Sequence, residues 1–194
     1  MHTRVTQAFK TSFVLTLMVF SSQTIAFDPH EALKQSKESN DGTVVVGRTQ
    51  WMRCSLGQQW DGNTCTGDAS RHNWEDANAL PGLMNAQGGF ASYTDWRLPT
   101  IDELASIRQC SAGSTTETVT LPSGQRTFRK CTEDSARPAI DSRDFPNDDG
   151  SIVWSSTPDT SDSSLAWIVN IGVGYTDSFF RSYEQRVRLV RTLQ

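Results

Sequence analysis

The sequence predicts an α+β fold, in which two short helices and long loops precede an antiparallel sheet and disulfides hold the domain together. Two helix-start signals lie at Asn73 and Thr100. Four cysteines form an even set, which is typical of a disulfide-stapled domain. Four β-like runs joined by short turns predict an antiparallel meander near the C-terminus: residues 151–157, 165–172, 175–181 and 186–191.

Residues 1–26 have the organisation of a secretory signal peptide. Arg4 and Lys10 precede an apolar run of about ten residues, and the segment ends on the small residue Ala26. A membrane-spanning helix needs roughly 20 apolar residues, so this length favours a cleaved signal over an uncleaved anchor. We therefore expect a periplasmic or secreted protein with no transmembrane segment after signal cleavage.

The net charge and the length of the remaining chain limit its possible partners and its number of domains. The 194 residues have a formal net charge of −4, and removal of residues 1–26, which contain two bases and no acid, makes it −6. A mildly acidic chain does not favour nucleic acid or an anionic membrane as a partner. Residues 27–42 form a polar N-terminal arm, and residues 43–194 are long enough for one domain with its own core.

The cysteines favour disulfides over a metal site. Three pairings are possible, and pairing of sequence neighbours would close loops with ten and twenty intervening residues. Each bridge would add on the order of 3 kcal/mol by restricting the unfolded chain. The chain has no Cys-x-x-Cys pair, and His30 and His72 are the histidines after residue 26, which disfavours zinc. The predicted disulfide cysteines are Cys54, Cys65, Cys110 and Cys131.

The first half of the domain predicts a strand and a helix. Residues 43–54 are rich in valine and tryptophan and predict one β segment. Asn73 is suited to cap a helix over residues 73–86, with acids in its first turn. Pro81 and Gly82 are expected to end this helix or to break it into a shorter second piece.

The string DWRLPTIDELASI at residues 95–107 predicts a strand end followed by a helix start. Pro99 restricts the residue before it to an extended conformation. Thr100 and Glu103 match the Thr-x-x-Glu capping box, and Trp96 and Leu98 alternate toward one side. The string has no nucleophile or general base, so we interpret it as structural. This structural set comprises Asp95, Trp96, Arg97, Leu98, Pro99, Thr100, Glu103 and, later in the chain, Trp154.

Several of these strings, in this order, resemble the Lcl C-terminal domain family, named after a domain of a Legionella collagen-like adhesin. The resemblance covers roughly residues 45–191. It implies an exported bacterial domain of C-type-lectin-like fold, and in the namesake adhesin the domain binds sulfated polysaccharides. The present chain departs from the namesake in its acidic charge and in lacking a collagen repeat. The strings that carry the resemblance are Trp51-Met52-Arg53-Cys54, Trp74-Glu75-Asp76-Ala77, Asp95-Trp96-Arg97-Leu98-Pro99-Thr100, Trp154-Ser155-Ser156-Thr157 and Arg186-Val187-Arg188-Leu189-Val190-Arg191.

Two loops and a set of aromatic residues are candidate binding sites. One loop has oxygen-bearing side chains that suit calcium, although Asp and Asn also form ordinary turns. The candidate calcium ligands are Asp144, Asn147, Asp148 and Asp149. A short basic run in a predicted hairpin could bind a polyanion, or its side chains could simply form the solvent-exposed face of that hairpin. The basic residues are Arg126, Arg129 and Lys130. Four aromatic side chains could stack on sugar rings if they are exposed: Tyr93, Phe179, Phe180 and Tyr183. The alternation of Arg186 and Arg188 with Val187 and Leu189 predicts a half-buried last strand.

Together these features predict a binding domain that is not an enzyme and has no cofactor other than a possible calcium ion. A polysaccharide or cell-surface glycan is the expected ligand, following the family resemblance and the two candidate loops. The alternative is a structural or interaction module of the bacterial envelope with a protein partner. The catalytic relatives of lectin-like folds use reactive cysteines or metals, and the four cysteines of this chain are expected to be paired.

Overall fold

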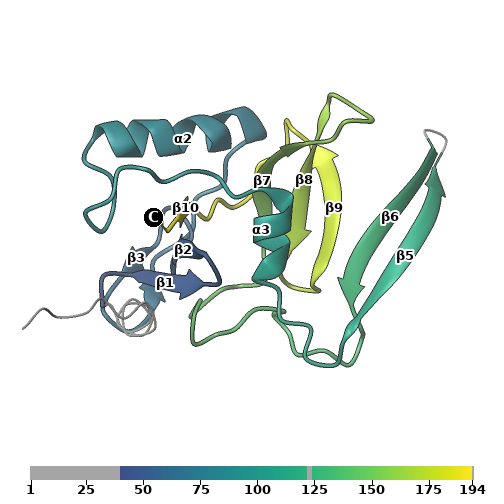
Figure 1. The fold of residues 1–194 in the computed structure, drawn as a ribbon, viewed down its shortest axis with the longest axis horizontal. Coiled ribbons are helices and arrows are strands. Elements are labelled where there is room, and N and C mark those ends of the chain that lie inside the picture. The colour runs from purple at the N-terminus through teal and green to yellow at the C-terminus, as the bar shows by residue number, and fades with distance from the viewer. Residues whose placement is uncertain (1–39, 122–123, 194) are drawn as a thin grey trace, which may run out of the picture.

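The computed structural model describes residues 40–121 and 124–193 (Figure 1). The predicted signal peptide and the arm as far as residue 39 lie outside the described residues. Within them the fold is mainly antiparallel sheet with two short helices, α2 (Trp74–Ala86) and α3 (Ile101–Ser106). This confirms the predicted mixture of helix and antiparallel sheet. No helix in the described part of the chain is long and apolar enough to span a membrane.

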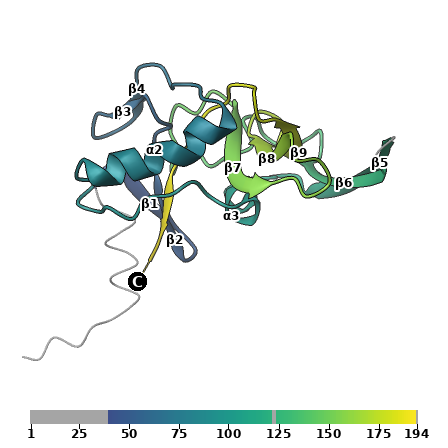
Figure 2. The same ribbon diagram turned by 90° about the horizontal axis from the view of Figure 1, so that it is seen from above.

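The largest sheet has five strands in the order β5-β6-β9-β8-β7, and every neighbouring pair is antiparallel. The predicted meander forms its β7-β8-β9 part. The β5–β6 hairpin joins the outer edge of β9 through a single pair, Lys130 with Tyr175, and stands out from the body of the fold (Figures 1 and 2). The strands are β5 (Ser114–Leu121), β6 (Gly124–Cys131), β7 (Ile152–Pro158), β8 (Leu165–Asn170) and β9 (Tyr175–Phe180).

The predicted single β segment at residues 43–54 is wrong, because the chain reverses within it. Strand β1 (Thr43–Val46) pairs with β2 (Thr49–Met52) through a two-residue turn at Gly47 and Arg48. Gly47 has a φ of 61°, a conformation that glycine adopts without steric cost. The high β propensity on both sides of the glycine hid this turn in the sequence.

The expected fourth strand of the meander is also wrong, because the last strand of the chain belongs to another sheet. Strand β10 (Val190–Thr192) pairs with β2 and completes a three-stranded sheet of order β1-β2-β10. The residues before it run between the two sheets: the Trp154 N–H donates to the Arg186 carbonyl (3.0 Å) and the Met52 N–H to the Leu189 carbonyl (3.0 Å). This segment is therefore buried on both sides, whereas the sequence predicted a half-buried strand.

Helix α2 continues through Pro81, which corrects the expected break. The proline gives up one backbone hydrogen bond of the helix. Pro81 and Ala77 are the buried residues of α2 and are four positions apart, so both lie on its inner face. Burial of the proline ring offsets the missing bond, and the helix ends only at Ala86.

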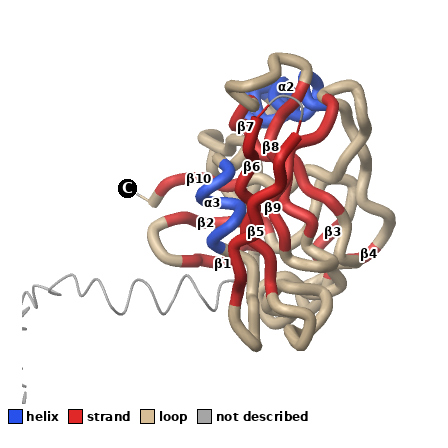
Figure 3. Tube along the Cα trace, turned by 90° about the vertical axis from the view of Figure 1, so that its right-hand side faces the viewer, coloured by secondary structure: helices blue, strands red, loops and turns tan. Residues whose placement is uncertain are grey.

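Strands β7 and β8 are buried on both faces, and this divides the core in two. Successive residues of a strand point to opposite faces, so Val153 and Val169 pack toward Leu104 of α3 while Trp154 and Ile168 pack toward Ala77 of α2. Helix α3 lies against the sheet in Figures 1 and 3, and α2 lies beyond the β7 edge. Helix α3 therefore covers one face of these strands, and α2 packs toward the opposite face at the β7 edge together with Val187 and Leu189.

Two disulfides close loops beside these sheets. Cys54 pairs with Cys65 and Cys110 pairs with Cys131, so sequence neighbours are joined and none of the four cysteines is free. Cys65 begins the short strand β4 (Cys65–Thr66), which pairs with β3 (Gln59–Trp60). Cys131 is the last residue of β6, so the second bridge fastens the base of the projecting β5–β6 hairpin.

Candidate functional site

The residues of the DWRLPT string have structural roles in this fold. Trp96 and Leu98 are 2% and 4% exposed and belong to the core on the α2 side. The predicted capping box is present: the Glu103 N–H donates to Thr100 Oγ1 (3.3 Å) and the Thr100 N–H donates to Glu103 Oε2 (2.9 Å). Asp95 accepts a hydrogen bond of 2.7 Å from Arg191. Each polar member of the string is thus engaged within the fold.

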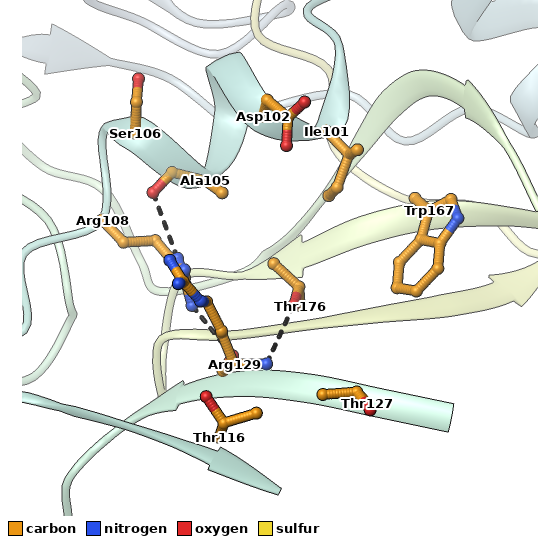
Figure 4. Close-up of a pocket in the computed structure, with 10 residues that line it drawn as sticks. All are labelled: Ile101, Asp102, Ala105, Ser106, Arg108, Thr116, Thr127, Arg129, Trp167 and Thr176. Carbon is orange, nitrogen blue, oxygen red and sulfur yellow. Dashed lines mark hydrogen bonds between the residues drawn. The ribbon is translucent and has the colours of Figure 1, made fainter. Parts of the chain in front are cut away.

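A groove of about 660 Å³ lies next to this string, between α3 and the sheet (Figure 4). Helix α3 supplies one wall with Ile101, Asp102, Ala105 and Ser106. The β5–β6 hairpin supplies the facing wall with Thr116, Thr127 and Arg129, and the partly exposed ring of Trp167 and the Thr176 hydroxyl come from β8 and β9. The groove exists because β6 separates from β9 after their single paired position.

Two arginines mark one end of the groove. Arg108 follows α3 and is held by backbone carbonyls: its guanidinium donates to Ala105 (3.2 Å), Arg129 (3.0 Å) and Gly174 (2.9 Å). Burial lowers the pKa of the Arg108 guanidinium, and the neighbouring Arg129 cation lowers it further. The Arg129 guanidinium has no ion-pair partner within residues 40–121 and 124–193. The two like charges give this end of the groove a positive character suited to an anionic group.

The predicted basic cluster is divided by the pleat of β6. Arg129 lines the groove, whereas Lys130 pairs with Glu117 of β5 at 2.7 Å. Neighbouring residues of a strand point to opposite faces, so Lys130 points away from the groove. Arg126 lies in β6, and its side chain is outside what the structure describes.

The Asp-rich loop is held by arginines. Asp148 accepts a hydrogen bond of 2.8 Å from Arg188, and these side chains are 5% and 2% exposed. Asp149 pairs with Arg186 at 2.5 Å. The other two predicted calcium ligands make backbone contacts: the Asn147 side chain donates to the Cys65 carbonyl (2.8 Å), and the Asp144 carbonyl accepts from Arg53 (3.0 Å).

The ion pairs of the Asp-rich loop bear on the candidate calcium site. Within the described residues no three or more acidic, histidine or cysteine side chains converge in a way that could hold a metal ion. Calcium in this loop would have to compete with Arg188 and Arg186 for the carboxylates of Asp148 and Asp149. These ion pairs disfavour the calcium site that the sequence suggested, and calcium titration is the measurement that tests it.

Three of the four candidate aromatic side chains are well exposed. Tyr93, Phe180 and Tyr183 are 38%, 50% and 52% exposed, and Phe179 is partly buried. The Arg191 guanidinium lies 3.7 Å from the ring centroid of Tyr93, so this ring already has a cationic neighbour. Phe180 and Tyr183 lie together, with ring centroids 5.6 Å apart in an edge-to-face arrangement.

The sequence did not single out Arg108 or Trp167 as site residues. The alternation of β8 contained a usable signal for Trp167, because Leu165 and Trp167 alternate with the buried Ala166 and Ile168. Arg108 had no comparable signal. Its place in the groove depends on the contact between the end of α3 and the base of the β5–β6 hairpin.

Comparison with known families gives a match over most of the chain. The model of the Lcl C-terminal domain family matches residues 42–191, which include all the described sheets and helices up to β10. This match confirms the resemblance found in the sequence. No curated protein matches the chain.

Proposed function

The chain belongs to the Lcl C-terminal domain family, and on that premise we propose that it is an exported domain that binds a polysaccharide or cell-surface glycan without catalysing a reaction. The two disulfides fit a periplasmic or extracellular location, where such bonds persist. A cleaved signal peptide at residues 1–26 and a role in adhesion are parts of this proposal. A C-type-lectin-like classification of the fold is a further part, and the antiparallel sheet flanked by two helices is compatible with it.

The groove beside Trp167 is the observation that carries this proposal. A sugar ring presents an apolar face and a rim of hydroxyls, and binding sites for such molecules combine an aromatic surface with a few polar groups. The groove combines the Trp167 ring with the hydroxyls of Thr116, Thr127 and Thr176. Arg108 and Arg129 at one end could bind a carboxylate or sulfate substituent through their guanidinium groups.

A binding role is favoured over catalysis by what the cysteines and the groove offer. A reactive thiol would require a free cysteine, and all four cysteines are paired. The hydroxyl of Ser106 at the groove wall donates to the Glu103 carbonyl at 2.6 Å, which is a structural contact within α3.

Retention on immobilised heparin and a glycan array, each with and without added calcium, test the proposal. We expect the protein to bind a subset of glycans and the Arg129→Ala variant to bind them less tightly. Lys130→Ala is the matched control, because it removes one positive charge from the adjacent residue on the opposite face of β6. Equal weakening by both variants would indicate a non-specific charge effect, and flat binding across every glycan and heparin would overturn the proposal.

An interaction module with an envelope-protein partner is the second candidate. Among the strands of the described residues, β5 pairs only with β6, and residues 114–118 on it are exposed. An open strand edge can accept a strand from another protein through backbone hydrogen bonds. Crosslinking followed by co-purification distinguishes the two candidates, because this alternative requires one protein partner at fixed stoichiometry and no selectivity among glycans.

A further inference from the structure

We propose that the exposed rings of Phe180 and Tyr183 form a second subsite, and that the ligand is a linear polysaccharide lying across both this subsite and the groove. The inference rests on the proposed function and adds to it the length and charge pattern of the ligand. Its basis is a pocket of about 270 Å³ lined by Leu165, Ser178, Phe179, Phe180 and Tyr183.

The register of β8 and β9 places this pocket next to the groove. Trp167 of the groove pairs with Ser178 of the pocket, and two residues further along both strands Leu165 pairs with Phe180. Residues two apart in a strand point to the same face, so Trp167 and Leu165 share one face of β8. From Thr176 in the groove to Phe180 in the pocket the chain advances four residues, or about 13 Å. One extended ligand can therefore contact both places.

The backbone that carries the two aromatic rings is held by hydrogen bonds, and the rings contact each other edge to face. The Tyr183 N–H donates to the Phe180 carbonyl (2.9 Å), and the Arg181 N–H donates to the Ser164 carbonyl (2.9 Å). The Arg181 guanidinium donates to the Leu165 carbonyl (3.1 Å) and stacks on Trp74, 4.1 Å from its ring centroid. A platform that is already ordered loses less entropy on binding than a mobile loop would lose.

The surroundings of Phe180 favour a sugar over an apolar protein segment. Phe180 also lines a second hollow of about 640 Å³, whose other lining residues are polar: Asn73, Glu75, Asp76, Ser163, Ser164, Arg181 and Ser182. Carboxylates, amides and hydroxyls can hydrogen-bond sugar hydroxyls while an aromatic ring covers the apolar face of the sugar. An apolar protein segment would remove the exposed carboxylates of Glu75 and Asp76 from water, at a cost in free energy.

The charges at the two ends of this surface differ. Two cations and one acid line the groove (Arg108, Arg129 and Asp102), whereas two acids and one cation line the hollow beside Phe180 (Glu75, Asp76 and Arg181). An anionic substituent is attracted at the first end and repelled at the second. The ligand inferred from this arrangement is a linear chain with carboxylate or sulfate groups at the groove and uncharged sugars at Phe180 and Tyr183, not a chain sulfated on every residue.

Calorimetry with oligosaccharides of graded length tests this arrangement. Hyaluronan fragments are the first probe because their carboxylated and uncharged sugars alternate, and heparin fragments of equal length are the uniformly charged comparison. We expect the affinity of the intact protein for hyaluronan to rise with length once a fragment reaches both subsites. Phe180→Ala and Tyr183→Ala should each weaken binding of the long fragments by about fivefold or more, and leave binding of the shortest fragment unchanged.

The control variants separate a subsite from a folding effect. Tyr183→Phe keeps the ring and should keep the gain in affinity with length. Val173→Ala removes an exposed apolar side chain elsewhere and should leave the affinity unchanged. Val173 is 40% exposed and lines neither the groove nor the pocket at Phe180 and Tyr183. Thermal unfolding identifies any variant that has lost its fold.

The outcomes distinguish this inference from the proposed function. If glycans bind but the affinity does not depend on length or on Phe180 and Tyr183, the second subsite is overturned and the groove proposal stands. A preference for uniformly sulfated heparin at every length would overturn the charge pattern. If no oligosaccharide binds, the proposed function fails and this inference fails with it. If Tyr183→Ala releases a crosslinked protein partner while glycan binding persists, the aromatic rings are a protein-docking surface and the inference is wrong.

Discussion

Arg97 donates two hydrogen bonds of 2.7 Å to the carboxylate of Glu103, which also accepts the backbone N–H of Thr100 at 2.9 Å. One carboxylate therefore completes the capping box of α3 and fastens the helix to the preceding extended segment. Because α3 supplies a wall of the candidate groove, this pair links a purely structural motif to the position of the proposed binding residues.

We predict that Glu103 makes the protein more sensitive to acid. The hydrogen bonds from Arg97, with that from Thr100, lower the pKa of Glu103 below its ordinary value of 4.5. A carboxylate with a lowered pKa stabilises the folded state above its unfolded pKa, and this contribution is lost as the pH falls through the folded pKa. Glu103→Gln keeps a capping-box side chain and removes the charge, so it should cost about 0.5–1 kcal/mol at pH 7.

Urea unfolding of the wild type and of Glu103→Gln across the pH range checks this prediction. The difference in unfolding free energy should stay constant from pH 7 down to about pH 5 and shrink below the ordinary glutamate pKa. Asp102→Asn is the control, because Asp102 is an exposed acid in the same helical turn. A difference that does not change with pH would show that the ion pair with Arg97 is not the source of the effect.

Substitution of Trp96 should lower stability without lowering the intrinsic affinity of the folded protein for its ligand. The ring is 2% exposed, and its Nε1–H donates to the Phe90 carbonyl at 2.9 Å. Trp96→Ala should cost about 3 kcal/mol or more, because a large cavity remains. Thr100→Ala should cost about 1 kcal/mol through loss of the helix cap. Chemical denaturation gives both values, and a Trp96 variant of full stability that no longer binds glycan would return the DWRLPT string to the candidate site residues.

The helix starts could be predicted because the residues that determine them are close together in the sequence. The capping box at Thr100 and the helix cap at Asn73 each depend on residues within one turn. The errors concern contacts between distant residues. Pro81 is a local helix breaker that burial overrides, and the pairing of β10 with β2 joins residues near opposite ends of the domain. The groove depends on such distant contacts, so the sequence pointed to Arg129 but missed Arg108 and Trp167.

Loss of Asp148 should be among the most damaging single substitutions. Its partner Arg188 is 2% exposed and also donates to the Met52 carbonyl (3.0 Å) and to the Arg53 carbonyl. Burial lowers the pKa of the Arg188 guanidinium, and the charge of Asp148 opposes this shift. Asp148→Asn removes the balancing charge from a buried cation, and we expect it to cost about 3 kcal/mol of unfolding free energy.

Denaturant unfolding of matched variants separates this buried pair from its exposed neighbour. Asp149→Asn should cost less than about 1 kcal/mol, because the Asp149 carboxylate is 56% exposed. Adding Arg188→Met to Asp148→Asn should recover part of the loss, since the cation is then absent. Equal costs for Asp148→Asn and Asp149→Asn would contradict the view that burial of the pair sets its importance.

The ion pairs of Arg186 and Arg188 with the Asp-rich loop lead to a prediction about calcium. Arg188 and Arg186 occupy the carboxylates of Asp148 and Asp149, so a calcium ion could bind there only by displacing a buried and a partly exposed guanidinium. We therefore expect millimolar calcium, or its removal with a chelator, to leave the unfolding temperature unchanged. A ligand that binds the folded state raises the unfolding temperature in a saturable way. A saturable rise with calcium but not with magnesium, abolished by Asp149→Asn, would show that the Asp-rich loop is a metal site and that the ion pairs rearrange to form it.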